Sequence, residues 1–190
     1  MNFPLKAQRS KKWFCLLICL MLLPVTAQAQ LTDGEKCMVG VYRVSVRVVV
    51  TDEAKSLTGL DVNAVRQRVE NKLKQAGLMI LSEREGKREV GKPHIDVLID
   101  HLPVIAHEGG EIDAEVITEE LHFAQEVIPV RRKNVTVYRS VWISPPRATV
   151  IQSATPHNRI SRVVINAVGN LVDTFLAAHR KANPKRRSGR

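Results

Sequence analysis

Residues 41–82 read VYRVSVRVVVTDEAKSLTGLDVNAVRQRVENKLKQAGLMILS, and this stretch decides the fold class. Val41–Asp52 is rich in valine with alternating polar residues, which predicts a strand. Asp61 is placed to cap a helix whose apolar residues recur every three or four positions. These apolar residues are Val62, Val65, Val69, Leu73 and Ala76. Gly77 fits the left-handed position that ends such a helix, and Leu78–Ser82 predicts a second strand. A strand, a helix and a strand in this order form a βαβ unit, whose two strands lie parallel.

More strands are predicted downstream, at His94–Val104, Ala114–Val130 and Val135–Ser144. Their connections are short, so they should form an antiparallel meander. Arg147–Thr155 is interpreted as a loop with one short extended piece at Ala148–Ile151.

The last predicted element is a helix with a continuous apolar stripe that ends at Asn183-Pro184. The stripe consists of Ile160, Val163, Val164, Ala167, Val168, Leu171, Val172, Phe175 and Leu176. We therefore expect an α+β fold: a two-layer sandwich of a five-stranded mixed sheet with two helices on one face, in the order β-α-β-β-β-α. The opposite face must be wet or covered by a partner. It carries His94, Asp96, Asp100, Glu120 and His122.

Residues 1–29 have the layout of a secretory signal peptide. A basic start without acids precedes the unbroken apolar run Trp13–Leu23. Ala27-Gln28-Ala29 then supplies the small residues that signal peptidase requires, so we expect cleavage before Gln30. The apolar run is about half of the roughly 20 residues that a spanning helix needs, and a retained signal anchor is the alternative. The sequence predicts an exported protein, periplasmic or secreted, with no transmembrane span after cleavage.

Cys37 is the single cysteine left after cleavage, so no intramolecular disulfide holds the fold. We interpret it as a partly buried apolar residue, with a reactive thiol or an intermolecular disulfide as the alternative. Neither Cys19 nor Cys37 follows the small residues of a lipoprotein signal.

The charge is unevenly divided. Between Gln30 and His179, 19 Lys and Arg balance 19 Asp and Glu. A neutral domain, predicted at 30–182, argues against a broad nucleic-acid footprint. The positive excess lies at the C-terminal end, where residues 183–190 form a predicted disordered tail. Lys185, Arg186, Arg187 and Arg190 are candidates for binding an anionic envelope surface, and the alternative is a solubilising end.

Several segments resemble an uncharacterised family of exported bacterial proteins. They are VENKLKQAGLMIL (69–81), AQEVIPVRR (124–132), RSVWIS (139–144) and NLVDTFLAAHRKANPK (170–185). The family shows a VE-x-L-x-x-AG helix and ends in LVD-x-F…NPK. It has no assigned activity, so the resemblance implies no functional residues. The element order also looks, at fold level, like the lipopolysaccharide-assembly envelope proteins.

One polar cluster is a candidate for chemistry. His94, Asp96 and Asp100 share a strand face, and a histidine with carboxylates can bind a divalent metal. The simpler interpretation is a solvated sheet face, since no HExxH pair, Cys cluster or GxSxG motif occurs. We therefore expect no cofactor and a non-enzymatic binding module that uses an open sheet face or edge. Its expected partner is an envelope protein or an anionic envelope surface. The alternative is a hydrolase or metal-dependent enzyme, which requires a deep polar pocket around these three residues.

Overall fold

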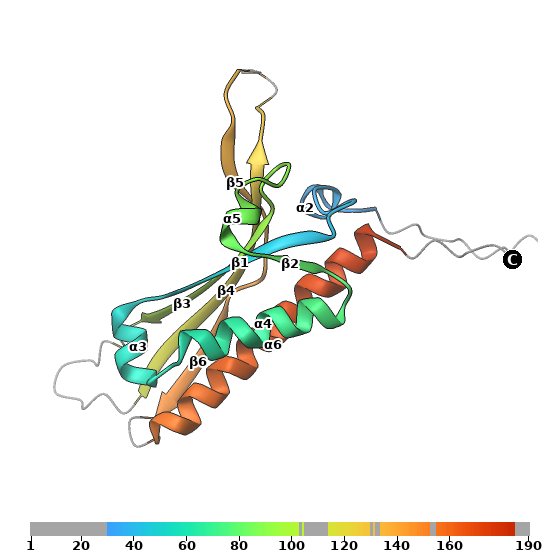
Figure 1. Cartoon of the computed structure of the whole chain (residues 1–190). Coiled ribbons are helices and arrows are strands. Elements are labelled where there is room, and N and C mark those ends of the chain that lie inside the picture. The colour runs from blue at the N-terminus through green and yellow to red at the C-terminus, as the bar shows by residue number, and fades with distance from the viewer. Residues whose placement is uncertain are drawn as a thin grey trace, which may run out of the picture. The chain divides into compact units, whose positions relative to one another are not determined.

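The computed structural model describes residues 30–102, 104, 114–129, 131, 134–152 and 155–184. The chain divides into two units, Met1–Gln30 and Leu31–Arg190, and the description below concerns the second. The strands are β1 Arg43–Val50, β2 Met79–Leu81, β3 His94–Leu102, β4 Ala114–Val127, β5 Val137–Ile143 and β6 Arg147–Gln152. The helices are α2 Asp33–Lys36, α3 Asp52–Thr58, α4 Val62–Gln75, α5 Glu83–Gly86 and α6 His157–Ala182 (Figure 1).

The predicted βαβ unit is confirmed. Asp61 caps α4 by accepting a hydrogen bond from the Asn63 N–H, at 2.8 Å. At the other end Gly77 adopts a φ of 92°, and the Leu78 N–H bonds to the carbonyl of Leu73 at 3.0 Å. Because this turn reverses the chain in one residue, β2 returns beside β1 and pairs with it in parallel.

The sheet is mixed, with the strand order β2-β1-β3-β4-β5 and β6 also paired with β4. β1 lies parallel to β3, while the predicted antiparallel meander of β3, β4 and β5 is confirmed. The register is well defined in the centre, where Val48 lies opposite Val97 and Val97 opposite Leu121. These central side chains are buried and form the floor of the core.

Helices α4 and α6 lie side by side on one face of the sheet (Figure 1). Leu171 and Phe175 of α6 are fully buried, as the stripe predicts. Val163 is 44% exposed, so the buried stripe is narrower than predicted at the start of the helix. By length and composition α6 is apolar enough to cross a membrane. Its buried apolar residues belong to the core and pack against β4 of the sheet.

The predicted order β-α-β-β-β-α is wrong in detail. Arg147–Gln152 forms a sixth strand, β6, where a loop was expected, and three short helices are added. Pro145-Pro146 separates β6 from β5 without turning the chain away, because Ser144 just before them donates its N–H to the Leu121 carbonyl at 2.8 Å. β5 and β6 therefore follow β4 end to end as one interrupted edge.

The amino-terminal segment is tied to the end of α6. Lys181 forms an ion pair with Glu35 of α2 at 2.8 Å. The Asn183 side chain accepts a hydrogen bond from the Gly40 N–H at 2.7 Å and donates one to the Met38 carbonyl at 2.9 Å. The predicted signal peptide at 1–29 and the basic residues 185–190 lie outside the described residues.

Candidate functional site

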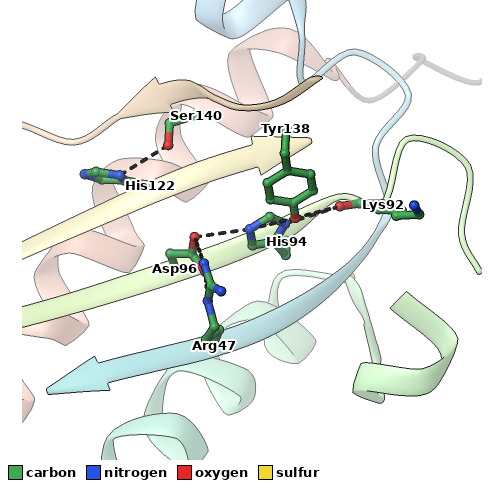
Figure 2. A network of polar contacts seen from close by, with 7 residues as sticks. All are labelled: Arg47, Lys92, His94, Asp96, His122, Tyr138 and Ser140. Atoms are coloured by element: carbon green, nitrogen blue, oxygen red, sulfur yellow. Dashed lines mark hydrogen bonds and ion pairs between the residues drawn. The ribbon is translucent and has the colours of Figure 1, made fainter. Parts of the chain in front are cut away.

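The sheet face opposite the helices carries a polar network on β3 (Figure 2). His94 and Asp96 alternate with buried apolar residues, so both point to this face. Arg47 of β1 binds Asp96 through two nitrogens, each 2.8 Å from a carboxylate oxygen. Nε2 of His94 lies 3.1 Å from Asp96 Oδ2. The carboxylate of Asp96 thus has donors on two sides.

Tyr138 of β5 closes this network. Its ring stacks on His94 with the ring centroids 4.4 Å apart, and its hydroxyl lies 2.7 Å from His94 Nε2. The Lys92 carbonyl accepts from the same hydroxyl at 3.2 Å. His94 and Asp96 are consequently 6% and 7% exposed, so the expectation of a wet face is wrong for these two residues.

The surroundings of Asp96 favour its charged form. Burial raises the pKa of this carboxyl, but the hydrogen bonds from His94 and Arg47 outweigh burial and lower it to about 2. The network is therefore a satisfied ion pair, with its donors and acceptors already engaged with one another.

The other candidate ligands do not join the network. Asp100 is exposed and accepts a hydrogen bond from the Thr51 hydroxyl at 2.9 Å. His122 lies 2.9 Å from Glu120 on its own strand. Within the described part of the chain, no group of three or more His, Cys, Asp and Glu is placed to hold a metal ion.

A cleft of about 340 Å³ beside β1 reaches only part of the network. His94 and Arg47 line it, together with residues of α4 and α5, whereas Asp96 and Asp100 do not. The three residues thus do not form the deep polar pocket that the enzyme alternative requires.

Glu119 is a functional candidate that the sequence reasoning missed. It lies on the helix-covered face of β4, between Ile99 of β3 and Arg147 of β6, and is fully buried. One carboxyl oxygen accepts a hydrogen bond from the Thr149 hydroxyl at 2.7 Å, and the other has no partner among the described residues. Burial raises the pKa of Glu119 to about 7, against the smaller opposing effects of the Thr149 hydrogen bond and the Arg147 charge.

The edge formed by β6 is open. The Leu121 carbonyl points towards this edge, because it accepts from Ser144. Backbone groups alternate in direction along a strand, so the N–H and C=O groups of Glu119, Ile117 and Glu115 also point towards β6. These residues lie opposite Arg147, Thr149 and Ile151. The remaining β6 residues therefore direct their backbone N–H and C=O groups away from the sheet. These are Ala148, Val150 and Gln152, of which the Gln152 carbonyl accepts a hydrogen bond from the Thr155 N–H at 2.8 Å.

A groove of about 360 Å³ runs between β6 and the first turns of α6. Its floor is apolar, with Ile151 and Ile160 buried, while Val150 on the strand is 68% exposed. Arg159 of α6 lines the same groove. An extended chain added beside β6 would meet the backbone groups of Ala148 and Val150, which have no partner among the described residues, together with apolar side chains.

Cys37 and the basic C-terminal residues were also the subject of predictions from the sequence. Cys37 is free and partly buried, as the simpler interpretation predicts. Lys185, Arg186, Arg187 and Arg190 lie outside the described residues, so surface binding by the tail stays a prediction.

No known protein family and no curated protein sequence matches the chain. Its structure is similar, at low scores, to several solved bacterial proteins. The PelC dodecamer from Paraburkholderia phytofirmans is 10% identical over 74% of this chain and 87% of that chain, with a TM-score of 0.37. A minor lipoprotein from Acinetobacter baumannii is 12% identical over 75% and 94%, with a TM-score of 0.37. The rare lipoprotein B from Shewanella oneidensis is 13% identical over 72% and 89%, with a TM-score of 0.28. Likenesses at this level carry no argument about function, and the candidate site rests on the chain's own geometry.

Proposed function

We propose that this chain is an exported, non-enzymatic binding protein of the cell envelope. Its binding site is the free edge of β6, which takes up an extended segment of another envelope protein as an added strand. The observation that supports this most directly is the outward direction of the backbone groups of Ala148 and Val150 beside the groove. Added strands obtain affinity from such main-chain hydrogen bonds and specificity from side-chain pockets.

The unprotected state of this edge favours the proposal. Sheet edges that have no partner are usually blunted by prolines, inward charges or a covering element. In β6 the central position is instead the exposed Val150, and α6 stands beside the edge without filling the groove. By contrast, the His94–Asp96 network has its polar groups engaged with one another, which argues against a catalytic use.

Photo-cross-linking in cells that export the protein tests the proposal. A photoreactive residue at the exposed Gln152 should give one adduct of discrete mass, and the same residue at Val90, which is 93% exposed on a distant loop, should give none. Val150→Pro should abolish the Gln152 adduct, because it removes an outward N–H without removing a bond to β4. Val150→Thr keeps that N–H and should keep the adduct. An adduct that persists in Val150→Pro would overturn strand addition at this edge.

A further inference from the structure

The balanced charge of the domain conceals two regions of opposite sign. From Val127 to Val172 the sequence contains no Asp or Glu at all. The same stretch holds seven basic residues: Arg131, Arg132, Lys133, Arg139, Arg147, Arg159 and Arg162. Residues 30–126 have the opposite bias, with 18 Asp and Glu against 12 Lys and Arg. The neutral sum is therefore a poor guide to the surface.

The acid-free stretch coincides with the open edge of the sheet. It supplies β5 and β6, which follow each other end to end along β4, and the first turns of α6, which lie beside β6 (Figure 1). Arg139, Arg147, Arg159 and Arg162 are all exposed. None of these four forms an ion pair with a described residue, although the charge of Arg147 acts on Glu119 opposite it, whereas Arg43 and Arg47 at the opposite side of the sheet are both paired with acids.

The arginines nearest to β6 lie on the helix side of the groove. Arg147 alternates with Ala148 and so projects to the same side as Thr149, whose hydroxyl meets the buried Glu119. Arg159 approaches from α6 and lines the groove itself. Arg147 is the first residue of β6 and lies outside the lining of the groove, so the two arginines flank the groove from β6 and from α6.

We propose that the segment bound at β6 is acidic, with Asp or Glu side chains directed at Arg147 and Arg159. This inference rests on the proposed function, because it names the chemistry of the partner for that same edge. Arginine binds carboxylates through planar, paired hydrogen bonds. The two-residue spacing of the outward backbone groups matches the alternating N–H and C=O groups of an extended peptide, a repeat that an anionic polysaccharide lacks.

Fluorescence anisotropy with synthetic eight-residue peptides tests this chemistry. The peptides alternate Val with Glu, Val with Gln, or Val with Lys. The Glu peptide should bind at least about tenfold more tightly than the Gln peptide at low salt, and the Lys peptide should not bind. The double variant R147Q/R159Q should remove most of that tenfold difference, and so should high salt. The matched control is R84Q/R88Q, which neutralises two exposed arginines beside α5 and should change nothing.

The outcomes separate the two proposals. If the Glu and Gln peptides bind equally and both lose binding in Val150→Pro, strand addition stands and the acidic partner is overturned. If the Glu peptide binds equally to the parent and to Val150→Pro, and polygalacturonate binds as well as the peptide, the anion preference stands and strand addition is overturned. Failure of all three peptides to bind would overturn both.

Discussion

Two buried carboxyl groups on neighbouring strands, one on each face of the sheet, differ in which form, charged or neutral, their surroundings favour. Asp96 of β3 lies on the open face, and Glu119 of β4 lies under the helices. Burial raises the pKa of both, yet that of Asp96 falls to about 2 while that of Glu119 rises to about 7. Asp96 has two contacts from Arg47 and one from His94, whereas Glu119 has a single hydroxyl. Burial opposes ionisation of both carboxyls, and the charged donors around Asp96 outweigh it, whereas the single hydroxyl and the more distant Arg147 charge at Glu119 do not.

The prediction with the largest expected effect concerns the helix-covered face of the sheet, where Glu119 lies. Leu171→Ala should reduce the free energy of unfolding by about 2–5 kcal/mol, because Leu171 is fully buried between α6 and the sheet. Asp173→Asn on the solvent side of the same helix is the control. Its carboxylate is 57% exposed and pairs with Lys72, so we expect a change below about 1 kcal/mol. Urea unfolding of both variants measures the difference. Equal stability of parent and Leu171→Ala would mean that α6 does not close the core.

The next test uses the pH dependence of Glu119. Its pKa lies above the ordinary 4.5, so the folded state holds this proton more tightly than the unfolded state. Stability from this group is therefore highest below pH 4.5, falls as pH rises from 4.5 to 7, and is constant above. The parent should lose about 3 kcal/mol over that range relative to Glu119→Gln, which cannot ionise. Urea unfolding of both proteins at pH 4.5 and pH 8 gives this difference, and parallel pH profiles would contradict it.

Asp96 should show the smaller effect, and with the opposite sign. Because its pKa is lowered from 3.8 to about 2, it stabilises the folded state above pH 4, and this stability is lost as pH falls through 2. Asp96→Asn should therefore reduce the free energy of unfolding by about 2 kcal/mol at pH 7 and by much less at pH 2. If Asp96→Asn loses the same free energy of unfolding at pH 7 and at pH 2, the opposite pH dependence of Asp96 and Glu119 is contradicted.

The spacing of apolar residues predicted the helices and strands that have one apolar and one polar face. The apolar stripe through Leu171 and Phe175 and the turn at Gly77 are local signals, and the structure confirms both. β6 was missed as a full strand because Pro145-Pro146 reads as an end of the sheet, and only the bond from Ser144 to Leu121 shows that the chain stays on β4.

The polar sites were predicted less well. Glu119 and Glu120 are adjacent in a strand, so one of them has to face the core, and the parity of Glu119 with Leu121 and Phe123 identifies which. That signal was available in the sequence. The burial of His94 under Tyr138 could not be predicted from the sequence. Tyr138 reaches His94 across β4 only because the pairing of β4 with β5 shifts register beside Ala124. A shift of this kind depends on long-range pairing.

The contact between Asn183 and Gly40 places both ends of the domain at one pole of the molecule. The β6 groove lies at the other end of α6, a helix of 26 residues that spans roughly 39 Å at 1.5 Å per residue. A tether or a fluorescent fusion joined directly before Leu31 or after Asn183 should thus leave the groove unobstructed. For the same reason a short linker from Asn183 back to Leu31 should allow circular permutation, with new termini opened in an exposed loop far from β6.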